Sequence, residues 1–117
     1  MANAFKLKTF DGSSTAANTD MTIYTGKAST ETTVIGMSIA NITGSQVTVD
    51  VKVESDTSDT ETNSNVFLIK DAPIPSGSTL VPVGGDQKVV LQATDVLKVQ
   101  CDTANAVDTI VSILEIT

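Results

Sequence analysis

Apolar and polar residues alternate most regularly between residues 47 and 54. Val47, Val49, Val51 and Val53 are separated there by Thr48, Asp50, Lys52 and Glu54. Successive side chains of a β-strand point to opposite sides, so this pattern predicts a strand with one face in a core and the other in water. The valines are the predicted core face, and the residues between them are predicted to be solvated.

Shorter segments with alternating or β-branched residues recur along the chain, separated by turn-forming residues. Further strands are predicted at residues 5–10, 21–25, 32–41, 66–70, 79–83, 88–91, 96–101 and 109–116. Gly36 lies within one of these segments and predicts a β-bulge. About eight or nine short strands with a turn roughly every ten residues are typical of an antiparallel β-sandwich or jelly roll. The sequence therefore predicts one all-β domain over residues 1–117 and no helix.

Proline and glycine mark the predicted edges and turns. Proline has no backbone donor for a neighbouring strand, so Pro73 and Pro75 place residues 72–75 at a sheet edge or outside the ladder. Pro82 predicts that the strand at 79–83 is also an edge strand. The glycines in Gly-Gly-Asp-Gln at 84–87 tolerate positive φ, and they predict a hairpin loop between this strand and the next.

Residues 54–65 are predicted to form a mobile loop. Their sequence, Glu-Ser-Asp-Thr-Ser-Asp-Thr-Glu-Thr-Asn-Ser-Asn, contains no large apolar side chain. The segment therefore cannot bury enough surface to order itself. Its carboxylates could bind a cation such as Ca²⁺, but their spacing does not match an EF-hand loop. A solvated hairpin tip is the favoured interpretation.

Residues 1–10 are predicted to act as an assembly arm. They carry alternating apolar residues with few anchors in their own neighbourhood, so Phe5 and Leu7 are predicted to be buried against another subunit. The edge segment Pro73, Ile74 and Pro75 is a second predicted interface. The net charge of −7 works against crowding identical subunits. These contacts are therefore expected to be apolar and backbone-mediated rather than ionic.

The composition limits the partners of the chain. Hydrophobic residues make up 40% and aromatic residues 3% of the 117 residues, so the core must be aliphatic. The net charge is −7, and all seven basic residues are Lys. Nucleic-acid binding needs a basic face and usually Arg, and an acidic membrane surface would repel this chain. We therefore expect no nucleic acid and no membrane among its partners.

No catalytic, cofactor-binding or metal-binding residues are predicted. The chain lacks His, and its one cysteine, Cys101, ends an alternating strand where a half-buried apolar residue is expected. One cysteine cannot form an internal disulfide. No apolar segment reaches the about 20 residues that a membrane helix needs, and the N-terminus lacks a signal-peptide core. We expect a soluble chain, made in a cytoplasm, that has no cofactor and is not an enzyme.

The most distinctive motif of the sequence is Lys-Asp-Ala-Pro-Ile-Pro at 70–75, followed by Gly-Gly-Asp-Gln-Lys at 84–88. The two segments that contain it and three further segments resemble small virion structural proteins of tailed bacteriophages, of which phages of marine cyanobacteria carry many. The resemblance runs in order from about Thr22 to the C-terminus. It implies a particle component without catalytic residues, whose acidic loop at 54–65 is longer than is usual in the family. The five segments are residues 33–41, 46–53, 66–75, 83–91 and 107–116.

The resemblance leaves the place on the particle open. The favoured hypothesis is a capsid decoration (cement) protein that stabilises the head, forms homo-oligomers on the virion and contacts the major capsid protein. The alternative is a neck, collar or tail accessory subunit, and copy number on the virion separates the two. A carbohydrate-binding adhesion module is a further alternative. Only Phe5, Phe10, Tyr24 and Phe67 could stack on a sugar, which speaks against it.

Overall fold

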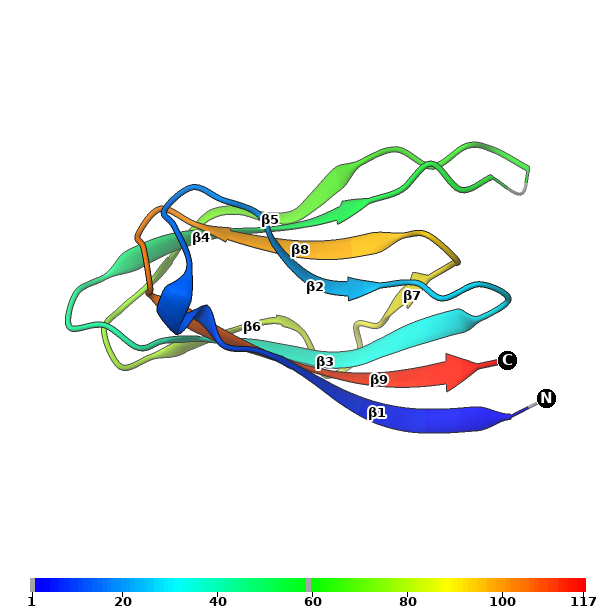
Figure 1. Ribbon diagram of the computed structural model, residues 1–117, viewed down its shortest axis with the longest axis horizontal. Helices are drawn as coiled ribbons and strands as arrows, with labels where there is room; N and C mark the ends of the chain where they lie inside the picture. The colour runs from blue at the N-terminus through cyan, green and yellow to red at the C-terminus, as the bar shows by residue number, and fades with distance from the viewer. Residues whose placement is uncertain (1, 59) are drawn as a thin grey trace.

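The chain folds into two antiparallel β-sheets stacked face to face, seen as an upper and a lower layer in Figure 1. The computed structural model describes residues 2–58 and 60–117 and contains nine strands in this part of the chain. A single 3-10 turn, η1 (Gly12–Ser14), is its one helical element. No helix among the described residues is long and apolar enough to cross a membrane. The predicted all-β sandwich is confirmed.

Each sheet combines strands from distant parts of the chain. Sheet I consists of β1 (Asn3–Phe10), β3 (Glu31–Asn41), β6 (Thr79–Val83), β7 (Val89–Leu91) and β9 (Val107–Ile116). Sheet II consists of β2 (Met21–Thr25), β4 (Val47–Glu54), β5 (Val66–Ile74) and β8 (Val96–Cys101). The strand order is β1-β9-β3-β6 in sheet I, where β7 also pairs with β3, and β2-β8-β4-β5 in sheet II.

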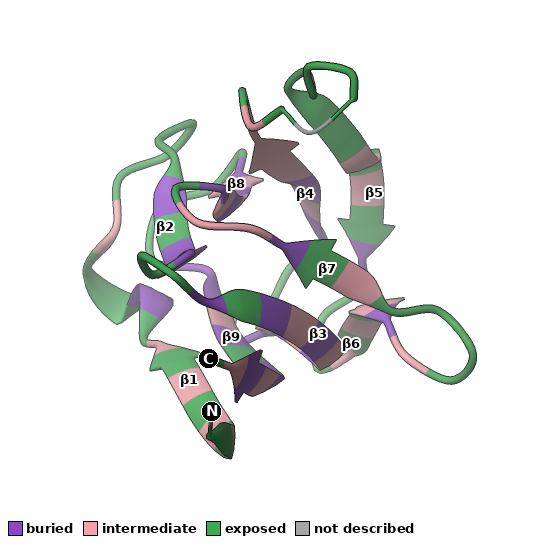
Figure 2. Cartoon of the chain, turned by 90° about the vertical axis from the view of Figure 1, so that its right-hand side faces the viewer, coloured by how far each residue is buried: buried purple, intermediate pink, exposed green. Residues whose placement is uncertain are grey.

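The core lies between the sheets and is mainly aliphatic, as the composition predicts. Val47, Val49 and Val51 of β4 are fully buried, and Val53 is half-buried against the same core. Figure 2 shows buried segments alternating with more exposed ones along the strands. The predicted inward orientation of the valines is confirmed.

Asp50 departs from this pattern, because it is only 9% exposed although the alternation predicts a solvated residue. The neighbouring strand β5 pairs with β4 through register shifts on both sides of Val51, and Asp71 has a φ of 55° there. The Asp50 carboxylate accepts hydrogen bonds from the Asp71 backbone N–H (2.7 Å) and from Lys70 Nζ (3.1 Å). The irregular backbone of β5 therefore covers Asp50.

β6 and β7 do not form a hairpin, so that prediction is wrong. Both strands pair antiparallel with β3, β6 with residues 37–40 and β7 with residues 32–34. Because β9 occupies the other edge of β3, β6 and β7 follow one another along a single edge. Gly85 has a φ of 62° in the connection between them. Turn-forming residues show that the chain leaves the ladder, but they do not show the direction in which it returns.

The other predictions from glycine and proline are confirmed. The register between β3 and β9 shifts between Val34 and Gly36, which is the predicted bulge. Pro73 lies in β5 and Pro82 in β6, and both strands are at the edges of their sheets. The edge strands at the opposite side, β1 and β2, contain no proline.

The predicted assembly arm lies in the sheet of its own chain. β1 pairs with β9 from Asn3 opposite Ile116 to Phe10 opposite Thr109, and its other edge is open. Met1 is outside the described residues. This pairing does not test a role in assembly, which stays a prediction for residues 1–10.

The acidic segment 54–65 connects β4 and β5 and is fixed at its base. The Ser55 and Thr57 hydroxyls donate hydrogen bonds to the carboxylate of Asp95, which is 4% exposed and lies between β7 and β8. Asp59 is outside the described residues. The mobility of the tip stays a prediction, while the base is tied to the rest of the sandwich.

Candidate functional site

The outer face of sheet I is the most distinctive surface of the molecule. Along β1, Phe5 and Leu7 are 77% and 60% exposed, whereas Lys6 and Lys8 are half-buried and Phe10 packs against the core. Figure 2 shows this alternation as exposed and intermediate bands along the strand. β9 alternates in the same way, with Ile110 and Ser112 exposed and their neighbours buried. The alternation that predicts β1 is confirmed, and the structure adds which side faces outward.

Cross-strand pairing joins the outward side chains into rows. In β1 and β9, Phe5 lies beside Leu114, and Leu7 lies beside Ser112. β3 continues these rows, and β6 and β7 extend the surface at the far edge. We call this surface the uncharged face, because it includes no Asp, Glu or Lys. Its members are Phe5, Leu7, Thr9, Thr33, Ser38, Val81, Val90, Ile110, Ser112 and Leu114.

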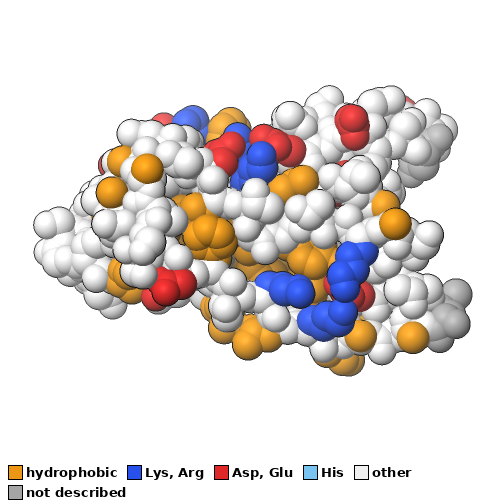
Figure 3. All heavy atoms as spheres, viewed as in Figure 1, with side chains coloured by type: hydrophobic (Ala, Val, Ile, Leu, Met, Phe, Trp, Pro, Cys, Tyr) orange, Lys and Arg blue, Asp and Glu red, His pale blue; other side chains and the backbone are white. Residues whose placement is uncertain are grey.

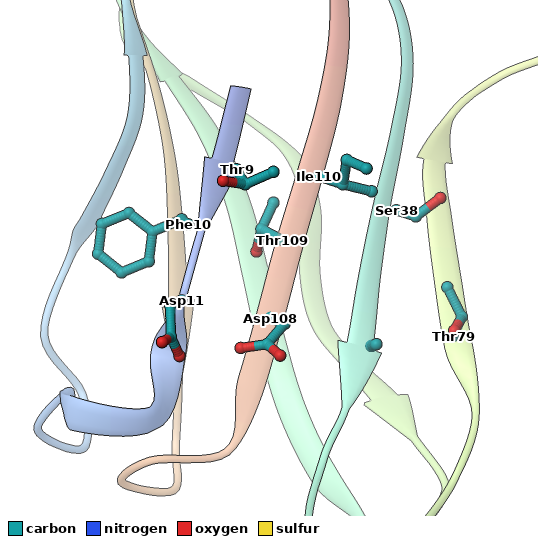
Figure 4. Close-up of a pocket in the computed structure, with 9 residues that line it drawn as sticks. Thr9, Phe10, Asp11, Ser38, Thr79, Asp108, Thr109 and Ile110 are labelled. Atoms are coloured by element: carbon teal, nitrogen blue, oxygen red, sulfur yellow. The ribbon is translucent and has the colours of Figure 1, made fainter. Parts of the chain in front are cut away.

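A depression of about 510 Å³ lies at one end of the uncharged face (Figure 4). Its lining includes the small side chains of Ser38, Ala40 and Thr79, with Ile110 and Thr9 beside them. Small residues on adjacent strands leave space where a close-packed interior would have none. The depression can therefore accept a large side chain from outside.

Two carboxylates, Asp11 and Asp108, border this depression (Figure 4). Asp108 accepts a hydrogen bond from the Gly12 backbone N–H (3.0 Å), and Asp11 accepts one from the Ser13 backbone N–H (2.9 Å). The bond from Ser13 holds the pKa of Asp11 below its ordinary value. Both carboxylates thus stabilise the turn after β1. Residues 2–58 and 60–117 contain no group of three or more His, Cys, Asp or Glu that could hold a metal ion.

Thr109 places a polar group unfavourably on the inner side of sheet I. It is 3% exposed, and its hydroxyl has no hydrogen-bond partner among the described residues. Val111 and Ile113 on the same side of β9 are apolar and fully buried. A buried hydroxyl without a partner costs about 1–3 kcal/mol. Thr109 therefore lowers the stability of the sheet without supplying a contact.

A polar cluster on the inner side of sheet I holds β1 in place. Glu115, which is 3% exposed, accepts a hydrogen bond from the Tyr24 hydroxyl (2.7 Å). It also forms ion pairs with Lys6 (2.8 Å) and Lys27 (3.3 Å). Lys6 belongs to β1, and because it is turned inward toward Glu115, the residues on either side of it are turned outward.

The cluster shifts the ionisation of its members. Hydrogen bonds, first from Lys6 and then from Tyr24, lower the pKa of Glu115 to about 2. The contact with Glu115 raises the pKa of Lys6, and burial raises the pKa of the Tyr24 hydroxyl. Glu115 and Lys6 are therefore both charged near neutral pH. The cluster is suited to fixing β1 rather than to transferring a proton.

The outer face of sheet II has the opposite character. Lys52 forms ion pairs with Asp20 (2.9 Å) and Glu54 (3.3 Å), and Lys98 forms one with Glu54 (2.7 Å). Figure 3 shows acidic and basic side chains side by side on this sheet. Hydrogen bonding to Asp20 raises the pKa of Lys52, and hydrogen bonding to Lys98 lowers the pKa of Glu54. Mixed charges of this kind are typical of a solvated surface.

The predicted interface residues are divided between the two sheets. Phe5 and Leu7 are exposed on β1, whereas Pro73 and Pro75 are exposed at the far edge of sheet II. Ile74 is 1% exposed and belongs to the core of its own chain, so its side chain is not available to a partner. A single flat contact cannot contain both exposed groups. Their part in subunit contacts stays a prediction.

Sequence reasoning missed the buried polar residues that organise the sandwich. Asn41, Asp95 and Glu115 are each 4% exposed or less. Only Glu115 had a visible signal, because it shares the side of β9 that carries the buried Val111 and Ile113. The Asn41 side chain bonds to Thr43 and Ser45 nearby and also donates to the distant Ile74 carbonyl (2.9 Å). Asp95 accepts from the nearby Gln92 N–H and also from the Ser55 and Thr57 hydroxyls of another loop. Local sequence does not show the distant partners.

Cys101 is 3% exposed, deeper than the half-buried position expected from sequence. Burial raises the pKa of its thiol. A thiol in this environment is mostly protonated near neutral pH and is a poor nucleophile.

No family model matches this sequence, and no curated protein sequence matches it. One similar solved structure comes from Bacillus endospore appendages, described as a novel family of disulfide-linked pili. The two chains are 15% identical with a TM-score of 0.46, and the similarity covers 97% of this chain and 84% of the other. A similarity at this level carries no argument about function.

Proposed function

We propose that this chain is a structural subunit of a tailed-bacteriophage particle and, more specifically, a capsid decoration (cement) protein. The observation that carries the proposal is the uncharged face. Residues 2–58 and 60–117 expose eight large apolar side chains, and five of them belong to this face, namely Phe5, Leu7, Val81, Val90 and Ile110. Exposed apolar side chains gathered on one face of an otherwise acidic chain are typical of a contact with another protein.

The assignment to a phage particle rests on the resemblance of five sequence segments to small phage virion proteins. A decoration protein needs a rigid domain, a face for contact and a solvated exterior. The outer face of sheet I offers the face for contact, and the ion-paired outer face of sheet II suits exposure to water. The proposal assigns no catalytic role to the chain, and its partners are further copies of itself and the major capsid protein.

The carbohydrate-binding alternative gains no support from the arrangement of the aromatic residues. Phe5 and Phe67 are exposed on different sheets, Tyr24 is buried and Phe10 is half-buried. They do not form the shared stacking platform that sugar rings favour.

Locating the chain on purified particles tests the proposal. We expect density for a β-sandwich of this size repeated over the head surface, and a copy number by quantitative mass spectrometry that matches the number of capsid sites. A few copies at the neck or along the tail would instead support the accessory-subunit alternative. Complete absence from purified virions would contradict both.

A further inference from the structure

We infer that the uncharged face of sheet I is covered by a second copy of this chain, stacked face to face. The inference deepens the proposed function, because it names the partner of the same surface. It can be tested with the purified chain alone, so it stands or falls separately from any binding to a phage particle.

Charge favours a second copy on this face and disfavours it elsewhere. Each chain carries a net charge of −7, and charges within about 10 Å act on one another at ordinary salt concentrations. The outer face of sheet II and the acidic loop 54–65 would bring carboxylates of both copies together. The uncharged face is a surface over which two such acidic chains can meet without desolvating an unpaired charge.

The uncharged face is also complementary to itself in shape. Phe5 is 77% exposed near one end of the face, and the depression of about 510 Å³ lies at the other end. Thr9, which borders the depression, is four residues from Phe5, or about 13 Å along an extended strand. The face therefore has a projecting aromatic ring and a recess that can receive one.

A two-fold axis brings the two features together. If the axis crosses the strands at the row that contains Leu7, Ser112 and Gly36, the Phe5 end of each copy lies over the depression of the other. Both contacts then form at once, as in the self-complementary interface of a symmetric dimer. The small Ser112 and Gly36 at the centre let the two sheets approach the spacing of about 10 Å that stacked sheets adopt.

The area of the face sets the expected strength. The face is four strands wide at about 4.8 Å per strand and about eight residues long at about 3.4 Å per residue, which gives a surface of about 500 Å². Two copies then bury about 1,000 Å² in total, the lower limit for a specific interface. We therefore expect a reversible dimer whose population depends on protein concentration.

The ends of the face predict how salt acts on this dimer. Glu31 lies beyond the Phe5 end, and Asp11 and Asp108 lie at the depression. The two-fold arrangement brings these acidic ends near one another at the rim. Added salt screens this repulsion, so the dimer becomes tighter with salt. A dimer held by ion pairs would become weaker.

Sedimentation velocity over a range of concentrations and salt tests the inference. Wild type should shift from monomer to dimer with rising concentration. Phe5→Ser should raise the dissociation constant at least about tenfold, because it removes the group that fills the recess. Ser112→Lys should abolish the dimer, because it places two like charges at the axis. Ser112 is exposed, so this variant is expected to fold, which circular dichroism checks.

Two matched variants on sheet II serve as controls. Phe67→Ser removes an exposed phenylalanine from β5, and Gln100→Lys adds a charge to the outer side of the central strand β8. Both should dimerise like wild type. The inference is overturned if the control variants weaken dimerisation as much as the sheet I variants do. It is also overturned if the wild-type chain stays monomeric up to about 1 mM.

Binding to isolated phage heads separates the inference from the proposed function. If the chain stays monomeric and binds heads in a way that depends on Phe5, the capsid surface covers the uncharged face. That result overturns the inference and supports the proposed function. A dimer that does not bind heads supports the inference and contradicts the function.

Discussion

The outer faces of the two sheets follow the same strand geometry and carry opposite chemistry. On sheet II, outward positions hold Lys52, Glu54 and Lys98, which are joined by ion pairs of 2.7–3.3 Å. On sheet I, the central outward rows hold apolar and hydroxyl side chains, Glu31 and Asp108 lie at their ends, and Lys6 and Glu115 are turned inward. Figure 3 shows several Lys side chains gathered toward the side of the molecule where both termini lie.

The two faces therefore differ in the side chains that they expose to the surroundings. A solvated outer face needs no apolar side chains, and sheet II has few. Sheet I instead stabilises its edge strand with ion pairs to the buried Glu115 on the inner side and leaves Phe5 and Leu7 outside. The following predictions test this contrast, in order of decreasing effect.

Removing the anchor of β1 should have the largest effect on stability. Glu115→Ala leaves the Lys6 and Lys27 ammonium groups and the buried Tyr24 hydroxyl without their shared acceptor. We expect a loss of about 2–4 kcal/mol in the free energy of unfolding, measured by urea titration. Glu31→Ala, an exposed position on β3, is the control and should change stability by less than about 0.5 kcal/mol. Equal effects of the two would mean that the cluster does not hold β1.

Acid should weaken the same anchor over a defined pH window. The pKa of Glu115 is about 2 in the folded chain and 4.5 ordinarily, so the unfolded chain binds more protons between these values. The stabilisation is fully present above about pH 4.5 and is lost as pH falls toward 2. Unfolding titrations across this window should show a shallower decline for Glu115→Gln. Some decline should remain, because the pKa values of Asp11, Glu54 and Asp102 are also lowered.

Replacing the buried hydroxyl of Thr109 should stabilise the chain modestly. Thr109→Val replaces a buried hydroxyl that lacks a partner with a methyl group of similar size. We expect a gain of about 1 kcal/mol and a higher melting temperature by calorimetry. A loss of stability would show that the hydroxyl is hydrogen-bonded in solution.

Breaking the ion pairs on sheet II should have the smallest effect. Lys98→Met removes the 2.7 Å contact with Glu54 at a partly exposed site. Such surface pairs contribute about 0–1 kcal/mol, so stability should change within that range. Dimerisation should be unaffected, and Lys88→Met in an exposed loop provides the baseline. A loss well above about 1 kcal/mol would mean that sheet II depends on its charges as much as sheet I depends on Glu115.

The sequence by itself determined the strands, the sandwich class and the edge positions of Pro73 and Pro82. These features are local, because alternation, a bulge at Gly36 and a missing backbone donor each act within a few residues. The same reasoning identified Phe5 and Leu7 as unusual without knowing where β1 would lie. It failed for the predicted hairpin loop at 84–87, since nothing local distinguishes a hairpin from a break in one edge strand.

Only the tertiary structure decided which side of each alternating strand faces the core. In β1 both sides contain an apolar residue, so the pattern alone does not distinguish Phe5 and Leu7 outside from Phe10 inside. That choice depends on pairing with β9, about a hundred residues away in the sequence, and on the ion pair between Lys6 and the buried Glu115. The burial of Asp50 and Asp95 also depends on tertiary contacts. Both carboxylates accept hydrogen bonds from other strands and loops, which meet only when the sandwich is assembled.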